Sequence, residues 1–123
     1  MSREKVRERS FEDLIAWQKA VALVTTIYQL SARWPADERF GLTNQVRRAA
    51  VSIPSNIAEG QGRQGSAELK RFLSVAHGSL CEVQTQLHIA RNLGFSADET
   101  IASALEDAAE VGRILRGLYN SLT

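Results

Sequence analysis

Residues 45–60 read QVRRAAVSIPSNIAEG, and their spacing is that of a helix with two different faces. Apolar residues recur every three or four positions, as they do in a helix that is buried on one side. These residues, with the preceding Leu42, are Val46, Ala49, Ala50, Ile53 and Ile57. Pro54 interrupts the pattern, because proline lacks an N–H and clashes with the carbonyl four residues earlier. The stretch predicts an amphipathic helix over residues 42–60, kinked near Pro54.

Three further amphipathic segments surround this helix. Ser10 is a good N-cap for a helix over residues 10–32, which Pro35 closes. Ser66 is the expected cap of a helix over residues 66–93, and Gly94 is its stop. Ser96 and Glu99 form a capping box for a fourth helix over residues 96–122.

Each of these helices carries an apolar face at helical spacing. For residues 10–32 the expected face is Leu14, Trp17, Val21, Val24 and Tyr28, widened by Phe11, Ala20 and Ile27. For residues 66–93 it is Leu69, Leu73, Ala76, Leu80, Val83, Leu87 and Ala90. For residues 96–122 it is Ile101, Leu105, Ala108, Gly112, Leu115, Tyr119 and Leu122, where Gly112 is expected to permit a close helix approach.

Four amphipathic helices with short connections predict an all-α fold, an antiparallel up-down-up-down four-helix bundle. Residues 61–65 are expected to form a turn, because glycines stand at positions 60, 62 and 65. Trp34 either packs over the end of the bundle or lies exposed at an interface. Residues 1–9 alternate in charge and are expected to form an arm outside the bundle of residues 10–123.

Composition favours a cytoplasmic, globular protein. The 123 residues suffice for one domain with its own core, and 44% hydrophobic with 24% charged residues is ordinary for a water-soluble chain. The single Cys81 excludes an internal disulfide, and the charged N-terminus does not read as a signal peptide. The longest apolar run, residues 21–24, is far too short for a membrane span.

Charge is unevenly distributed although the net charge is only +1. Residues 39–71 contain six bases and two acids, a net charge of +4, whereas residues 95–112 contain five acids and no base. Such a dipolar chain can offer one face to nucleic acid, or it can pair its basic face with the acidic face of a neighbouring copy. Both interpretations remain open from charge alone.

A polar stripe runs beside the apolar face of the helix over residues 42–60, and a second follows on the next helix. Their members are Gln45, Arg48, Ser52, Asn56 and Glu59, then Ser79, Glu82 and Gln86. We expect partial burial and mutual hydrogen bonds, with Arg48 paired to Glu82. The stripes predict either a binding pocket or an internal network that fixes helix register.

Catalytic and metal-binding patterns are weak. His77, Cys81, Gln84 and His88 share a helix face, but no second helix offers obvious further ligands and no Glu-x-x-His pair exists. The glycine-rich residues 60–65 match neither a Walker loop nor a dinucleotide fingerprint. The sequence therefore predicts a protein that is not an enzyme and that holds no metal or other cofactor.

Residues 45–60, followed by Arg63, resemble the signature of a four-helix-bundle family encoded within intervening sequences of bacterial 23S ribosomal RNA genes. FEDLIAWQKA at residues 11–20 resembles the opening of that family, and the likeness extends over residues 11–94. Its third helix is matched at Phe72, Gly78, Ser79, Glu82, Gln86, Leu87, Leu93 and Gly94. The resemblance implies a ring-like homopentamer without catalytic activity. It also implies similarity to the accessory protein of diversity-generating retroelements, a pentameric bundle that binds a reverse transcriptase and nucleic acid.

Two functions are therefore expected. The first is an oligomeric accessory protein that binds RNA or a nucleoprotein partner. Its basic side chains would contact the phosphate backbone. The candidate phosphate-binding residues are Arg47, Arg63, Lys70 and Arg71, with Arg39 next. The alternative is a purely structural, self-assembling module that recruits a protein partner without nucleic acid.

Overall fold

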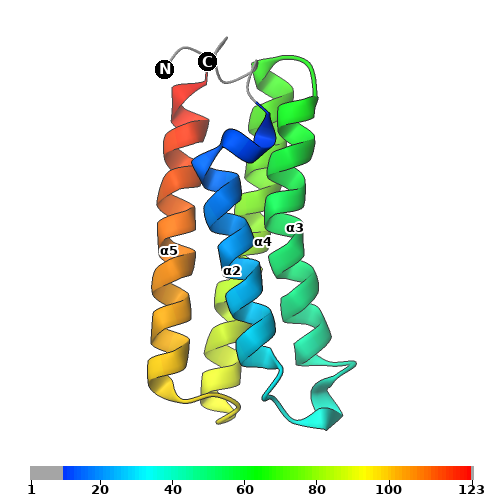
Figure 1. Ribbon diagram of the computed structural model, residues 1–123, viewed down its shortest axis with the longest axis vertical. Coiled ribbons are helices and arrows are strands. Elements are labelled where there is room, and N and C mark those ends of the chain that lie inside the picture. The colour runs from blue at the N-terminus through cyan, green and yellow to red at the C-terminus, as the bar shows by residue number, and fades with distance from the viewer. Residues whose placement is uncertain (1–9, 123) are drawn as a thin grey trace.

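The computed structural model describes residues 10–122 and confirms the all-α, up-down-up-down arrangement of four helices (Figure 1). The helices are α2 (Ile15–Ser31), α3 (Leu42–Gly62), α4 (Ser66–Asn92) and α5 (Asp98–Ser121). Two single 3₁₀ turns, η1 (Phe11–Asp13) and η2 (Ala36–Glu38), precede α2 and α3. The expected arm of residues 1–9 lies outside the described residues.

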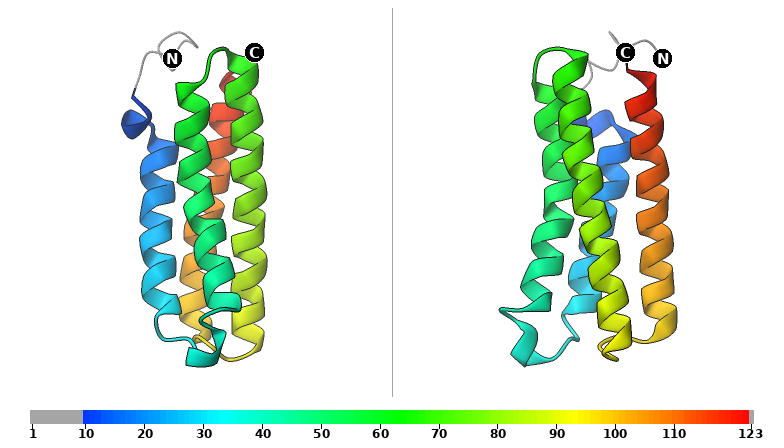
Figure 2. Two further views of the ribbon diagram at one scale, coloured as in Figure 1. Left: turned by 90° about the vertical axis from the view of Figure 1, so that its right-hand side faces the viewer. Right: turned by 180° about the vertical axis from the view of Figure 1, so that it is seen from behind.

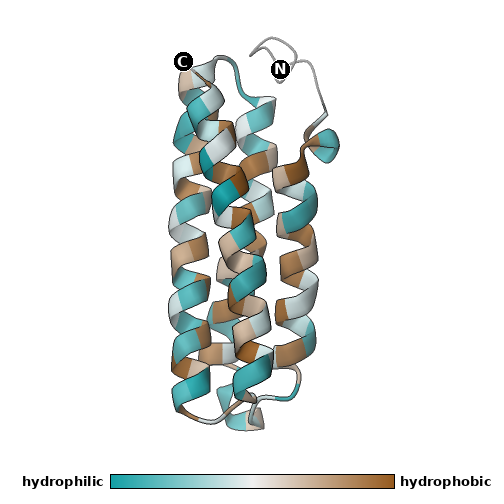
Figure 3. Cartoon of the chain, turned by 90° about the vertical axis from the view of Figure 1, so that its left-hand side faces the viewer, coloured by the Kyte–Doolittle hydropathy of each residue, from teal (hydrophilic) through white to brown (hydrophobic). Residues whose placement is uncertain are grey.

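The core lies along the common axis of the four helices, and α3 packs most extensively against α4. The two helices run side by side in both views of Figure 2. The predicted apolar face of α4 is confirmed, because each of its seven residues is buried. Hydrophobic and hydrophilic residues follow one another in stripes along the helices (Figure 3), as expected for helices with one dry and one wet side.

The predicted apolar face of α2 is confirmed only in part. Ala20 and Ile27, expected to widen it, are buried. They belong to a buried row with Ala16, Leu23 and Leu30, whereas the predicted central row is Leu14, Trp17, Val21, Val24 and Tyr28. Of that predicted row, Leu14 is buried but precedes the helix, the next three residues lie at the edge of the core, and Tyr28 is 42% exposed. Both rows are apolar at heptad spacing, so periodicity alone cannot decide which one faces the neighbouring helices.

The start of α2 also differs from the prediction. Ser10 caps the short turn η1, where its Oγ accepts a hydrogen bond from the Glu12 N–H at 3.3 Å. Leu14 is then extended, with φ −76° and ψ 126°, so the helix begins only at Ile15. The Phe11 ring packs edge-on against Trp17, 5.3 Å between centroids, and holds η1 against the helix.

Helix α3 is longer than predicted, and the turn that follows is shorter. The helix continues through Gly60 to Gly62, so the connection is residues 63–65, with Gly65 at φ +82°. Gly60 is not a stop signal: a Cβ there would lie 2.7 Å from the Cβ of Phe72 on α4. The glycine is required because the two helices approach closely at this point.

Pro54 is buried inside α3, and the helix runs through it without interruption. Proline has no N–H to donate to the carbonyl of Ala50, and the residues on both sides of it are nevertheless helical. The predicted change of helix direction at Pro54 stays a prediction.

Trp34 closes one end of the bundle. Of the two predicted alternatives, packing over the bundle end is confirmed and exposure at an interface is wrong. Its side chain is 5% exposed, and its ring lies 6.0 Å from that of Phe95. Its Nε1–H donates to Ser96 Oγ at 2.7 Å. The predicted Ser96–Glu99 capping box is wrong: α5 begins at Asp98 with Ala97 at its N-cap position and no side-chain cap, while the Ser96 hydroxyl accepts the indole N–H.

Helix α5 buries a face close to the predicted one. Ile101, Ala108, Leu115 and Leu122 are buried as expected, while Tyr119 is 37% exposed. A Cβ on Gly112 would lie 3.2 Å from Leu80 Cδ2, which agrees with the close approach expected there. Every helix within residues 10–122 is too short or too polar to span a lipid bilayer.

Candidate nucleic-acid interface

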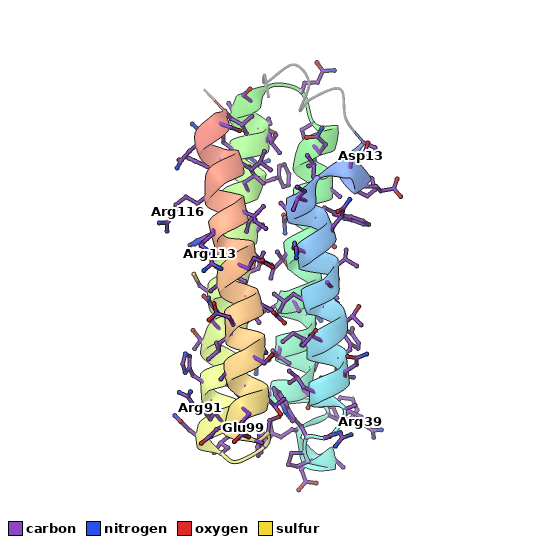
Figure 4. All side chains as sticks on the ribbon, turned by 60° about the vertical axis from the view of Figure 1, so that its left-hand side comes forward. Asp13, Arg39, Arg91, Glu99, Arg113 and Arg116 are labelled. Carbon is purple, nitrogen blue, oxygen red and sulfur yellow. The ribbon has the colours of Figure 1, made fainter. Side chains whose placement is uncertain are left out.

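A solvent-open groove with a volume of about 640 Å³ lies along α3 beside the C-terminal end of α2. Three of its lining residues are arginines and two are aromatic. The lining residues are Tyr28, Arg39, Phe40, Thr43, Asn44, Arg47, Arg48, Val51 and Ser52. Figure 4 places Arg39 at the lower end of the bundle, beside the connection between α2 and α3. We call this site the α2–α3 groove.

Arg47 forms the wall between the two helices. Its Nε donates to Ser31 Oγ at 2.9 Å, and one terminal nitrogen donates to the Tyr28 carbonyl oxygen at 3.3 Å. The guanidinium carbon lies 4.6 Å from the centre of the Tyr28 ring, a cation–π distance. A guanidinium has five N–H donors, so Arg47 is held in place while donors remain for a ligand.

Arg39 and Phe40 form the outer rim of the α2–α3 groove. The Arg39 guanidinium lies 5.1 Å from the centre of the Phe40 ring, and that ring is 85% exposed. The loop that carries them is anchored by Glu38, whose Oε1 accepts a hydrogen bond from the Leu42 N–H at 2.9 Å. Glu38 thereby satisfies one of the free N–H groups at the start of α3.

The electrostatic character of the α2–α3 groove is uniformly positive. None of its nine described lining residues carries a carboxylate, and Arg48 is exposed and forms no ion pair within residues 10–122. Guanidinium groups beside exposed rings can bind phosphates and stack on unpaired bases. Tyr28 was predicted to lie in the apolar core face, and Phe40 and Asn44 were not predicted as site residues, although an aromatic residue directly after Arg39 in a polar loop was an available signal.

The five predicted phosphate-binding residues do not form one surface. Arg39 and Arg47 line the α2–α3 groove, but Arg63 lies sixteen residues beyond Arg47, which is about 24 Å along a helix. Lys70 and Arg71 follow on α4, near the same end of the bundle as Arg63. Residues that contribute to one net charge along the sequence therefore lie at opposite ends of α3.

Arg63 and Arg71 are already paired with carboxylates. Arg63 contacts Glu59 Oε2 at 2.7 Å, and Arg71 contacts the two oxygens of Glu68 at 3.0 and 3.3 Å. The hydrogen bond from Arg71 lowers the pKa of Glu68, and the same bond raises the pKa of Arg71. These pairs reduce the net attraction of this end for a polyanion.

Among the described residues, the members of the predicted polar stripe bond to one another only in its centre. Ser52 Oγ lies 2.8 Å from Ser79 Oγ across the two helices, and Asn56 Nδ2 donates to Ser52 Oγ at 2.9 Å. Gln86 is buried, with its Oε1 unpartnered within the described residues. Gln45, Arg48, Glu59 and Glu82 are exposed.

The expected Arg48–Glu82 ion pair is absent from the described residues. Both side chains reach water, so neither charge needs the other as a partner. They line, together with Gln45, Ser52 and Gln86, a shallow hollow of about 270 Å³ between α3 and α4.

The histidine and cysteine face of α4 brings two groups together. Cys81 Sγ lies 3.9 Å from His77 Nδ1, while His88 Nδ1 lies 2.9 Å from a terminal nitrogen of Arg91. Within residues 10–122 no three residues among His, Cys, Asp and Glu are grouped as metal ligands would be.

Comparison with known proteins places this fold in a defined class. The family model described as 23S rRNA-intervening sequence protein matches residues 12–117, so the chain belongs to that family. The fold is similar to a crystal structure from Bacteroides thetaiotaomicron VPI-5482, a protein of unknown function from the S23 ribosomal protein family. The TM-score is 0.77 at 20% identity, over 85% of this chain and 98% of that one. Comparison with curated proteins yields no match.

Proposed function

We propose that this family member is a non-enzymatic, cytoplasmic accessory protein that binds single-stranded RNA in the α2–α3 groove. The observation that carries the proposal is three arginines and two exposed rings around one hollow that no carboxylate lines. The family name adds support, since it associates the family with ribosomal RNA genes.

Single-stranded RNA fits this groove better than a duplex does. Unpaired bases can stack on aromatic rings, whereas duplex RNA offers mainly phosphates and 2′-hydroxyls. Phe40 is exposed enough to take a base on its free face. Arg47, fixed by Ser31 and Tyr28, is ready to hold the adjacent phosphate without first being ordered.

The test is a titration of fluorescently labelled single-stranded RNA at several salt concentrations. Arg39→Gln and Arg48→Gln should each weaken binding and lower the log–log salt slope by about 0.7, because each removes one phosphate contact on a single strand. Phe40→Leu should weaken binding by about 1–3 kcal/mol through lost stacking and leave the slope unchanged.

Arg63→Gln is the matched control, because Arg63 lies at the other end of α3 and is paired with Glu59. It should leave both affinity and slope close to those of the unchanged protein. Absence of binding at low salt, or binding without salt dependence, would overturn the proposal. So would an equal loss in Arg63→Gln.

The exposed Phe40 also favours a second candidate, recruitment of a protein partner without nucleic acid. Exposed aromatic rings often anchor protein interfaces. In that case removing the charges of Arg47, Arg63, Lys70 and Arg71 together should leave recruitment intact, while Phe40→Ala should abolish it. Recruitment that survives removal of the four charges but is lost in Phe40→Ala distinguishes this candidate from RNA binding.

A further inference from the structure

A second hollow lies on a different pair of helices and is not part of the α2–α3 groove. Its volume is about 320 Å³, and it lies between α4 and α5, where we call it the α4–α5 pocket. Its lining residues are Leu73, Ser74, His77, Leu115, Arg116, Tyr119 and Asn120. Figure 4 shows Arg116 on the upper part of α5, far from Arg39 at the lower end.

The α4–α5 pocket has an apolar floor and a polar rim. Leu73 and Leu115 are 1% and 2% exposed, so the floor belongs to the bundle core. Tyr119 forms a wall and is 37% exposed, with the Lys70 Nζ 4.7 Å from the centre of its ring. A floor of this kind takes the body of a ligand, while the rim fixes its charged end.

The rim carries two permanent cations, Arg116 and Lys70. Arg116 and His77 line it, and Lys70 adjoins it through Tyr119. None of the described lining residues carries a carboxylate. Two acids of the same helices are engaged elsewhere, since Glu68 bonds Arg71 and Glu110 pairs with Lys19 at 3.3 Å. The positive charge at this pocket is therefore not cancelled from within it.

We propose that the α4–α5 pocket binds a phosphate monoester carried on a planar body, such as a nucleoside monophosphate. A phosphate monoester brings a charge of about −1.5 to −2 at neutral pH and three acceptor oxygens. Arg116, Lys70 and the His77 N–H supply donors for these oxygens. The exposed face of Tyr119 supplies a stacking surface for a base, and Asn120 and Ser74 offer hydrogen bonds at the rim.

Size and charge together favour this ligand class. The volume lies at the lower end of the usual range of small-molecule pockets, about 300–1,000 Å³. It accommodates one nucleotide rather than a dinucleotide. A simple carboxylate brings only one charge for two permanent cations, and an apolar ligand leaves Arg116 and Lys70 without a role. The same chemistry can arrive as a free nucleotide or as the phosphorylated end of an RNA chain.

The first experiment measures binding of adenosine 5′-monophosphate by calorimetry or NMR, with adenosine and inorganic phosphate as separate probes. The nucleotide should bind saturably and more tightly than either probe. Arg116→Gln and Lys70→Gln should each weaken nucleotide binding about tenfold, as expected for loss of one charged hydrogen bond. They should leave binding of adenosine unchanged.

Arg113→Gln is the matched control, because Arg113 lies one turn before Arg116 on the same exposed side of α5 but outside the pocket lining. It should leave nucleotide affinity within about twofold. Circular dichroism checks that each exposed substitution leaves the helices intact. Equal binding of adenosine and the nucleotide, an equal loss in Arg113→Gln, or no saturable binding at millimolar nucleotide overturns the proposal.

A second arm identifies the source of the phosphate. A short RNA with a 5′-phosphate is compared with the same RNA ending in a 5′-hydroxyl. A preference for the phosphate that disappears in Arg116→Gln identifies an RNA end as the ligand; nucleotide binding without that preference identifies a free nucleotide. Arg39→Gln and Phe40→Leu should not change nucleotide binding, so failure in this pocket is distinguishable from failure of the α2–α3 groove.

Discussion

At the scale of single residues, Gly60 is required by the side chain that packs against it and not by its own backbone conformation. It ends the stretch at residues 45–60, where glycine is typical of a helix stop. In the structure it is helical, and Phe72 occupies the space that a side chain would need. The glycine therefore sets the distance between α3 and α4.

Gly60→Ala should lower the free energy of unfolding by about 1–3 kcal/mol, because the new methyl group overpacks a close helix contact. Gly78→Ala is the control: Gly78 is also helical, but nothing lies within 4 Å of a Cβ there. That variant should gain up to about 1 kcal/mol from helix propensity. Urea denaturation measures both values, and equal effects of the two substitutions would contradict the packing argument.

Glu68 and Arg71 form the pair with a clear pH dependence. The Arg71 hydrogen bond lowers the pKa of Glu68 below its usual 4.5, so the folded state favours the ionised carboxylate. The stabilisation is therefore complete above the unfolded-state pKa, and it is lost as the pH falls through the lowered, folded-state pKa.

Carbon-13 NMR titration of the Glu68 carboxyl measures this shift directly. In Arg71→Gln the Glu68 pKa should return towards its usual value, while in Lys70→Gln it should stay lowered. The stability difference between the unchanged protein and Glu68→Gln should be small, since the pair is exposed. It should disappear at acid pH, and a difference that grows on acidification would contradict the assignment.

At the scale of elements, the connections at one end of the bundle are held by Trp34. The indole joins the loop after α2 to the connection between α4 and α5 through its bond to Ser96. It also covers the end of the core beside Phe95. Two connections far apart in sequence are thus positioned by one side chain.

Ser96→Ala should lower the free energy of unfolding by about 1–3 kcal/mol, because it leaves the buried indole N–H without a partner. Ser103→Ala, at an exposed position on α5, should be neutral or slightly stabilising. Thermal unfolding and the near-ultraviolet signal of Trp34 both report the change. An unchanged melting temperature in Ser96→Ala would show that the hydrogen bond contributes nothing.

At the scale of the whole molecule, the distribution of charge suggests an assembly. The α2–α3 groove carries three arginines and no lining carboxylate among the described residues, whereas the first half of α5 is acidic. A basic face on one copy and an acidic face on the next give the heterologous contacts that close rings. We propose self-association, with a homopentamer as the ring implied by the family resemblance.

Sedimentation velocity at micromolar concentration should give the mass of an oligomer rather than the 13.6 kDa of one chain. Reversing charge with Glu106→Lys and Asp107→Lys should shift the protein towards the monomer, because these exposed acids lie on the acidic half of α5. The exposed Asp37→Lys, in η2, is the control. A monomer mass for the unchanged protein would contradict the proposed self-association.

The sequence by itself determined the fold class, the order of the helices and the buried face of α4. A long helix with a single regular row of apolar residues can bury only that row. Only the tertiary structure decided which of two apolar rows on α2 turns inwards, that Ser96 partners Trp34 instead of capping α5, and that Gly60 serves packing. It also divided the predicted phosphate-binding residues between the α2–α3 groove, the Tyr119 ring beside the α4–α5 pocket, and two ion pairs. Each of these outcomes depends on which side chain meets which across helices, and local periodicity carries no information about the neighbour.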